Sequence, residues 1–330
     1  MVNVVIVTYG NRWRFLEQVV VSLKLIREVN KIIIVNNKSE YKLDEKFINF
    51  DNQIVLINLK ENSGSAGGFK IGLTYVMENF KQGFVWLLDD DNLPTPNTLN
   101  ILLNGFENKR KTRGNNMFAL MCLRPDRSYL QKIANGESVS RILPIKNSFF
   151  GFNLFNLPNQ IIGKLKLKQK PSNHEFISLP FAPYGGLFFP TEILDYIGLP
   201  DERYYLYADD FEFTNRITKA GGNIYLIPQA KVDDLEKSWI TQKQNLLRSR
   251  MLDQNNFKAY LSARNSTHFQ SHNRVSNRLM FNINKIIYLL YLFIVSIVSF
   301  KIRQFKLIVI AVKEGERGIF DNEKYIKQSN

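Results

Sequence analysis

The sequence feature that most constrains the fold is an apolar run, Val85–Leu88, that leads directly into three carboxylates at positions 89–91. A short continuous apolar run is typical of a strand buried on both faces, as in a parallel sheet. Ligands of open α/β sheets bind beyond the carboxyl ends of the strands, which is where these carboxylates would lie. Because adjacent carboxylates repel one another, the cluster predicts a site for Mg²⁺ or Mn²⁺ shared with substrate phosphates.

The spacing within the cluster suggests how such a cation would be held. In an extended segment, Asp89 and Asp91 project to one side and Asp90 projects to the other. Asp89 and Asp91 are therefore the candidate ligands of a metal diphosphate. The alternative is an acidic cap for a helix that starts after Pro96, since carboxylates are favoured at helix N-termini.

Short apolar runs and amphipathic stretches alternate along the first part of the chain. This alternation predicts right-handed βαβ units and a doubly wound α/β sheet. The glycine-rich loop 61–68 matches neither the Rossmann nor the P-loop pattern, which argues against a dinucleotide or ATP site of those types. The expected strands are 4–8, 31–35, 54–59, 118–123 and 224–227, and the expected helices are 15–29, 71–80 and 191–197.

Composition excludes several classes of protein. With 45% hydrophobic residues, the 330-residue chain can bury a large core and is not a disordered chain. Cys122 is the only cysteine, so the chain has no disulfide framework or thiolate metal cluster, which fits a reducing compartment. The start of the chain lacks a basic region and a cleavage site, and it reads as a first strand rather than a signal peptide. The net charge of +14 comes with no nucleic-acid-binding motif, so we expect no nucleic-acid partner.

A second acidic region, Asp209, Asp210 and Glu212, lies at a loop-to-helix junction rich in tyrosine and phenylalanine. An isolated Asp at such a position is usually a helix cap. Asp210, however, has aromatic neighbours that would desolvate its carboxylate, raise its pKa and suit it to act as a general base. Both interpretations remain open from these residues alone.

The C-terminal region is both basic and strongly apolar. The uncharged stretch 286–300 is shorter than the roughly 20 residues needed to span a bilayer, and a second apolar stretch, 305–312, follows it. Lysine and arginine flank both, which favours two helices at a membrane interface. A buried helical hairpin or a dimer interface is the alternative.

Alternating Lys and Leu at 164–170 predict an edge strand, with a lipid-facing segment as the alternative.

Six short motifs follow one another along the chain: Val7-Thr8-Tyr9, Asn36-Asn37-Lys38-Ser39, Asn62-Ser63-Gly64-Ser65-Ala66-Gly67-Gly68-Phe69, Asp89-Asp90-Asp91, Gly185-Gly186-Leu187-Phe188 and Asp209-Asp210-Phe211-Glu212. Taken in this order, they resemble the inverting family 2 glycosyltransferases of the GT-A fold, over roughly residues 3–264. Within that family, the glycine-rich loop joined to a triple Asp looks most like the galactofuranosyl- and rhamnosyltransferase branch.

The resemblance implies a role for each matching residue. Asp210 would accept the proton of the acceptor hydroxyl, and Asp89 and Asp91 would hold the metal on the donor diphosphate. Asp234 stands where the family often has a histidine ligand, and we expect it to be a third metal ligand. The expected donor-binding residues are Thr8, Tyr9, Asn37, Gly67, Gly68, Lys70 and Asp90, and the expected acceptor residues are Gly185, Gly186, Asp209 and Glu212.

The resemblance also implies a cellular setting. We expect an α/β GT-A domain over 1–265, with a donor half about 1–124 and an acceptor half about 125–265, and a membrane-associated helical tail over 266–330. The enzyme would act at the cytoplasmic membrane face, moving a UDP- or dTDP-linked sugar to a lipid-linked glycan in cell-surface polysaccharide synthesis. The rivals are a nucleotidyltransferase and a non-catalytic membrane-bound glycan- or nucleotide-binding protein. The oligomeric state stays open, and a homo-oligomer is compatible with it.

Overall fold

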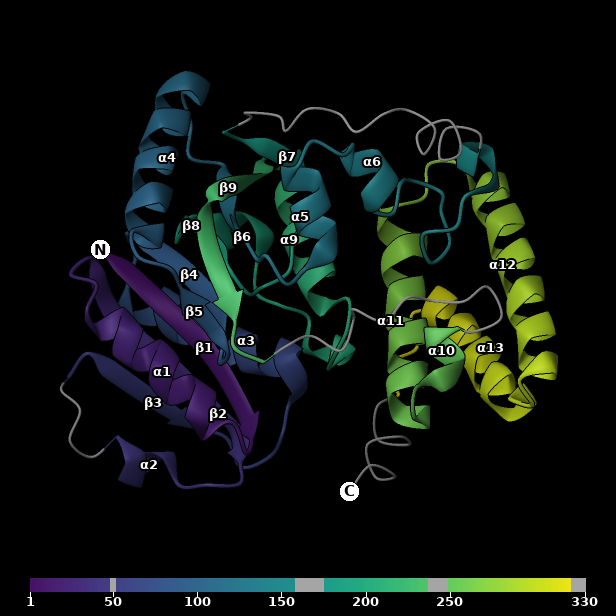
Figure 1. Cartoon of the computed structure of the whole chain (residues 1–330), viewed down its shortest axis with the longest axis horizontal. Coiled ribbons are helices and arrows are strands. Elements are labelled where there is room, and N and C mark those ends of the chain that lie inside the picture. Colours follow the sequence, from purple (N-terminus) through teal and green to yellow (C-terminus); the bar gives the residue numbers. More distant parts are fainter. Residues whose placement is uncertain (48–51, 158–174, 237–248, 322–330) are drawn as a thin grey trace.

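A nine-stranded mixed sheet forms the centre of the computed structural model, which describes residues 1–47, 52–157, 175–236 and 249–321 (Figure 1). The strand order is β3-β2-β1-β4-β8-β6-β9-β5, and β7 also pairs with β9. The pairings set β3, β2, β1, β4, β6 and β9 in one direction and β8, β5 and β7 in the other, so the expected mixed, mainly parallel sheet is confirmed. The strands are β1 (Val2–Gly10), β2 (Val29–Ser39), β3 (Ile54–Asn58), β4 (Phe84–Asp89), β5 (Asn92–Pro94), β6 (Phe118–Leu123), β7 (Ile177–Leu179), β8 (Leu187–Pro190) and β9 (Asn223–Asp234).

Helices cover both faces of this sheet because the strand residues alternate between two cores. Along β1, Val5 contributes to one core, whereas Val4 and Ile6 contribute to the other. The first core is covered by α3 (Gly64–Asn79), α5 (Ser128–Ala134), α8 (Ile193–Ile197) and α9 (Asp209–Lys219), and the second by α1 (Trp13–Lys24) and α4 (Thr98–Arg113). Short helices connect these layers: α2 (Leu43–Lys46), α6 (Val139–Ile142), η1 (Leu154–Asn156) and η2 (Glu202–Tyr204).

A helical unit stands at one end of the molecule, beside the sheet (Figure 1). Its core combines Phe149 with apolar residues of α10 (Arg250–Asp253), α11 (Asn256–Asn273), α12 (Arg278–Val298) and α13 (Ile302–Arg317). Gly315 lets α13 approach α11, because a Cβ there would lie 2.3 Å from the Arg264 carbonyl oxygen. The buried Asn284 donates to the Asn147 carbonyl and ties α12 to the segment between α6 and η1. The expected boundary at 265/266 falls inside α11.

Helix α12 keeps much of its apolar surface exposed. It is the one helix among the described residues that is long and apolar enough to cross a membrane, a match of length and composition only, with mean hydropathy 1.9. Only 28% of that apolar window is buried. The large exposed side chains of this region are Leu279, Ile286, Leu290, Tyr291, Phe293, Ile294, Ile297, Val298, Phe300 and Ile302.

Several predicted elements differ from those observed. The helix expected at 71–80 begins at Gly64, and most of the expected glycine-rich loop is therefore helical. The first helix ends at Lys24 rather than 29, because Val29 already pairs with Val2 in the sheet. The expected strand 164–170 lies outside the described residues.

Candidate active site

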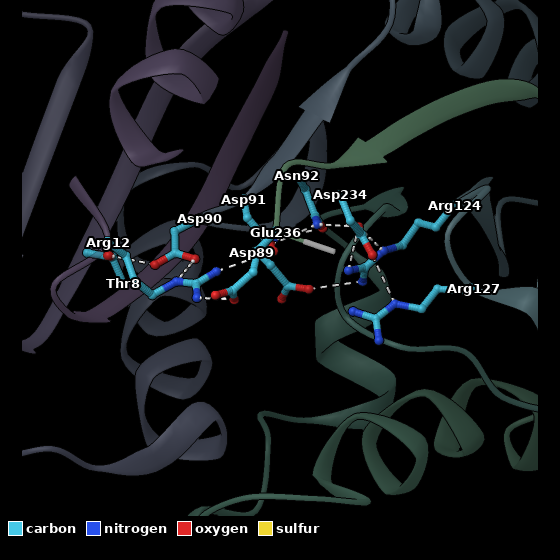
Figure 2. Close-up of polar contacts among 10 residues, drawn as sticks. All are labelled: Thr8, Arg12, Asp89, Asp90, Asp91, Asn92, Arg124, Arg127, Asp234 and Glu236. Carbon is cyan, nitrogen blue, oxygen red and sulfur yellow. Dashed lines mark hydrogen bonds and ion pairs between the residues drawn. The ribbon is translucent and has the colours of Figure 1, made fainter. Parts of the chain in front are cut away.

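The acidic cluster lies at the carboxyl end of β4, as predicted (Figure 2). Asp89 ends the strand, and its backbone N–H donates to the side chain of Asn92, which closes the turn at 3.0 Å. β5 then pairs with β9 so that Asn92 faces Asp234. This pairing brings the end of β9 to the cluster, where Asn92 Nδ2 donates to both Asp91 (3.2 Å) and Asp234 (3.0 Å).

Arg12, in the turn after β1, binds one side of the cluster. Its Nε donates to Asp90 Oδ1 at 2.7 Å, and its Nη2 lies 3.3 Å from Asp91 Oδ2. Its Nη1 pairs with Glu236 at 2.5 Å. Thr8, on β1, donates to the other Asp90 oxygen at 2.7 Å. Asp90 is thus held by two donors from the β1 end of the sheet.

Arg124 and Arg127 bind the opposite side of the cluster. The buried Arg124 donates from Nε to Asp234 Oδ1 at 2.8 Å and from Nη1 to Asp89 Oδ2 at 2.9 Å. The Nε of Arg127 lies 3.0 Å from the other oxygen of Asp234. Both arginines follow β6, so their guanidinium groups reach the same sheet edge as the carboxylates.

The charge of the cluster fits a divalent cation. Burial raises the pKa of Asp90 to about 7, although Arg12 opposes this. Burial and the neighbouring Asp89 charge raise the pKa of Asp91 to about 6. When all are ionised, the five carboxylates and three guanidiniums drawn in Figure 2 leave two net negative charges. Asp89 is also 37% exposed, so Asp89 and Asp91 together could hold a metal that takes its other ligands from phosphate and water.

Asp234, the expected third metal ligand, is bound by Arg124 and Arg127 in this structure, and its role as a metal ligand remains a prediction. Its side chain is 0% exposed, and each of its oxygens is paired with an arginine. Burial raises its pKa, and Arg124 and Arg127 act in the opposite direction. In the part of the chain that the structure describes, no three His, Cys, Asp or Glu side chains are grouped as a metal site.

Gly185 packs directly against the cluster from the loop before β8. A Cβ at this position would lie 2.3 Å from Asn92 Oδ1, 2.4 Å from Arg124 Nη1 and 2.6 Å from Asp89 Oδ2. A side chain would therefore displace the cluster. Gly186 has φ +95° and donates to the Leu87 carbonyl, so it serves the turn into β8.

The second carboxylate centre lies at the start of α9. The buried Asp209 accepts a 2.6 Å hydrogen bond from Ser65 in the first turn of α3. Asp210 is half-buried, and one of its oxygens accepts from the Phe211 backbone N–H at 2.8 Å. Burial and the Asp209 charge raise the pKa of Asp210 well above 3.8. The charge of Asp89 in the first centre adds to the pKa rise of Asp210 in the second.

Asp210 has the properties of a general base. Its pKa is raised, its carboxylate is not fully buried, and neither it nor Asp209 has a salt bridge among the described residues. The pKa of Asp209 is raised to about 6, chiefly by burial, while the Ser65 hydrogen bond limits the rise. Glu212, expected near the acceptor, forms an ion pair with Arg216 one turn along the helix, and its acceptor role remains a prediction.

Three of the predicted donor-binding residues lie at the acidic cluster, and the other four lie at α3 or hold its start. Thr8 and Asp90 lie in the acidic cluster, and Tyr9 is 54% exposed beside it, with the Arg12 guanidinium 5.9 Å from its ring centre. Asn37 accepts from the Ser63 backbone and donates to the Gly64 carbonyl, which fixes the start of α3.

The remaining three have packing or pairing partners away from the cluster. Gly67 and Gly68 are buried inside α3, and a Cβ on Gly68 would lie 2.6 Å from Val7. Lys70 forms an ion pair with Glu202 at 3.0 Å. Donor binding by all seven of these residues remains a prediction.

Sequence reasoning missed the three arginines, Asn92 and Ser65. Arg124 and Arg127 directly follow a predicted strand, so the rule that located the aspartates applies to them as well. Arg12 lies in the polar turn after the first strand, at the same edge. The pairing of Asn92 with Asp234 depends on strand register, for which the sequence carries no comparable signal.

Comparisons with known proteins find similarity to glycosyltransferases. The model of the family "Glycosyl transferase family 2" matches residues 3–152. A curated relative, the galactofuranosyltransferase GlfT1 of Mycolicibacterium smegmatis (strain ATCC 700084 / mc(2)155), is 21% identical over 228 residues, which cover 67% of this chain and 66% of the relative. The chain thus spans about two thirds of that relative.

The fold has a solved counterpart. The crystal structure of GalNAc-T7 with UDP, GalNAc and Mn²⁺ matches with a TM-score of 0.55 and 15% identity, over 81% of this chain and 47% of that one. The chain therefore spans about half of that protein, and the likeness shows the fold, in agreement with the expected GT-A class. The residues that match the family 2 model include Thr8, Arg12 and the Asp89–Asp91 cluster.

Proposed function

We propose that this chain is an inverting glycosyltransferase that takes a sugar from a UDP- or dTDP-linked donor. The observation that carries the proposal is the presence of two carboxylate centres at one sheet edge. One contains the Asp89 and Asp91 pair, which fits a metal diphosphate, and the other contains Asp210, which has the raised pKa of a general base. The match to the family 2 model and the glycosyltransferase names of the relatives support the same reaction class.

In this reaction, an acceptor hydroxyl oxygen bonds to the anomeric carbon while the bond from that carbon to the diphosphate breaks. Asp210 takes the hydroxyl proton, and the nucleoside diphosphate leaves with the bonding electron pair. A divalent cation, Mn²⁺ or Mg²⁺, on Asp89 and Asp91 would offset the charge that develops on the leaving diphosphate. Attack from the face opposite the leaving group inverts the anomeric centre.

The proposal is tested by titrating UDP, dTDP, GDP and CMP into the purified chain by calorimetry, with Mn²⁺ and with EDTA. We expect UDP or dTDP to bind, more tightly with Mn²⁺ than with EDTA, and Asp91→Ala to remove that difference. UDP as the preferred nucleotide would support a hexose, hexosamine or galactofuranose donor, and dTDP would support rhamnose. Failure of all four nucleotides to bind in either condition would contradict the proposal, and pyrophosphate release from a nucleoside triphosphate would indicate a nucleotidyltransferase.

We further propose that the acceptor is a lipid-linked glycan and that α12 attaches the enzyme to the inner face of the cell membrane. The exposed apolar residues of α12 recur every three or four positions, as at Ile286, Leu290 and Ile294, and therefore form one stripe. Arg303, Lys306 and Lys313 on α13 are exposed as well. An apolar stripe with nearby basic residues is suited to an anionic lipid surface.

The membrane proposal is tested by sedimentation with vesicles that contain anionic phosphatidylserine. The double variant Leu290→Asp/Ile294→Asp alters residues that are 56% and 60% exposed, and it should lower the bound fraction at least about tenfold. The matched control is Val21→Asp/Leu25→Asp on and just after α1, where the side chains are 48% and 83% exposed. Equal binding by both double variants would contradict a role for α12.

A further inference from the structure

The group formed by Asp234, Arg124 and Arg127 places two guanidiniums around one buried carboxylate. One carboxylate there is paired with two guanidiniums, so the group has one net positive charge. Its contact with the acidic cluster is the bond from Arg124 to Asp89 at 2.9 Å. If Asp89 binds a metal, as in the proposed function, that carboxylate is shared and the positive charge of the arginine group is only partly offset.

Asp234 fixes the position of this charge. Arg124 contacts one oxygen of Asp234 through two of its nitrogens, at 2.8 and 2.7 Å, and Arg127 contacts the other oxygen at 3.0 Å. The carboxylate is completely buried and is itself held by Asn92. Two guanidiniums fixed by one carboxylate lose less side-chain freedom on binding a ligand than mobile arginines would.

Arg127 is the accessible member of the group. Its side chain is 25% exposed, whereas Arg124 is 2% exposed. Figure 2 shows the guanidiniums of Arg124 and Arg127 on the side of Asp234 that faces Asp89. The planar fork of an arginine matches the oxygens of a phosphate, and such charge-assisted bonds are stronger than neutral ones.

We propose that Arg127 binds the donor diphosphate, with Arg124 behind it, and that Asp234 is the positioning residue for both. This inference rests on the proposed function. It assigns part of the diphosphate charge to fixed arginines and the rest to the cation on Asp89 and Asp91. The enzyme should therefore retain measurable affinity for a nucleoside diphosphate without any metal, and the two contributions should be separable by mutation.

The test is calorimetric titration of UDP and dTDP in EDTA and in Mn²⁺. Arg127→Gln should raise the dissociation constant in EDTA about tenfold, because one charge-assisted bond is lost. In Arg127→Gln, the gain in nucleotide affinity from EDTA to Mn²⁺ (the Mn²⁺ effect) should be at least as large as in the wild type. Asp91→Ala should do the opposite, with the Mn²⁺ effect lost and the EDTA affinity kept. Arg110→Gln, at an exposed arginine on α4, is the matched control and should change neither value.

Asp234→Asn separates positioning from metal binding. If Asp234 positions the arginines, the variant should lose affinity in EDTA as Arg127→Gln does, and melting by circular dichroism should verify that it is folded. Loss of the Mn²⁺ effect with unchanged EDTA affinity would make Asp234 a metal ligand and overturn the inference. So would an Arg127→Gln effect below twofold, or wild-type binding that requires Mn²⁺ absolutely. Absence of nucleotide binding in every condition would instead overturn the proposed function.

Discussion

The two carboxylate centres of this site are built in opposite ways. Arginines contact the carboxylates of the Asp89–Asp91 cluster, through Arg12 on one side and Arg124 on the other. At the start of α9, by contrast, Asp209 and Asp210 have a serine hydroxyl and backbone N–H groups as partners. Cationic partners favour the ionised form of a carboxylate, whereas burial beside another carboxylate disfavours it. The first arrangement suits the binding of charged ligands, and the second suits the uptake of a proton.

The largest effect is expected from the centre without arginines. Asp210→Asn keeps the shape of the side chain but removes its ability to accept a proton. We expect the transfer rate to fall about 10³-fold, equivalent to about 4 kcal/mol, with the dissociation constant of UDP within twofold of the wild type. A steady-state transfer assay and calorimetry measure the two quantities. Substantial transfer activity in the variant would exclude Asp210 as the base.

At the arginine-rich centre, the expected effect of a mutation is a loss of folding stability. Arg12→Ala leaves Asp90 and Asp91 without their shared cation, and we expect the free energy of unfolding to fall by about 2 kcal/mol at pH 8. The loss should be smaller at pH 5, where Asp90 and Asp91, with pKa values raised to about 7 and 6, bind protons instead. Urea unfolding at the two pH values tests this. Arg27→Ala, at an exposed arginine, is the control, and an equal loss in both variants would refute the role of Arg12.

Ser65→Ala should change the protonation of the α9 centre. The Ser65 hydroxyl donates to Asp209 and favours its ionised form, so its removal should raise the pKa of Asp209 further. We expect the transfer rate near pH 6 to fall severalfold, by about 1 kcal/mol, with a smaller loss at pH 8. A pH–rate profile checks the prediction. A uniform loss at all pH values would indicate displacement of α3 rather than a change in protonation.

The smallest effect is expected in the thermal stability of Asp210→Asn. The pKa of Asp210 is raised in the folded state above 3.8, so the folded chain holds this proton more tightly than the unfolded chain does. The protonated Asp210 side chain therefore makes its full contribution to the free energy of unfolding at pH values below 3.8. That contribution is lost as the pH rises through the pKa that Asp210 has in the folded chain. The variant avoids this loss and should melt a few degrees above the wild type at pH 8, with a smaller difference at pH 5. Melting at both pH values checks the sign.

The sequence predicts the edge of the sheet better than the contacts made there. Strand runs such as Val85–Leu88 are set by local composition, and the positions of Asp89–Asp91 follow from where the strand ends. The partners of those carboxylates depend on long-range geometry. Asp234 reaches Arg124, 110 positions away, only because β9 pairs with β5 and β6 in the observed register. No local pattern encodes that pairing, so the arginine partners of Asp234 could not be predicted from the sequence.

The start of α3 was missed for a related reason. Its first turns contain Gly64, Gly67 and Gly68, which have low helix propensity, and the sequence therefore suggests a loop. The helix begins there because the side chain of Asn37, distant in sequence, binds the backbone of Ser63 and Gly64. Tertiary contacts thus override the local preference.

The contacts of that first turn join the two halves of the site mechanically. Gly64 lies against the Tyr205 backbone, the Ala66 N–H donates to the Tyr205 carbonyl, and Ser65 donates to Asp209. The same helix packs against β1, the strand that supplies Thr8 to the acidic cluster. The distance from the Asp209–Asp210 pair to the acidic cluster is therefore set by one stiff helix before any ligand arrives. A chain assembled in this way should require little rearrangement when the second substrate binds.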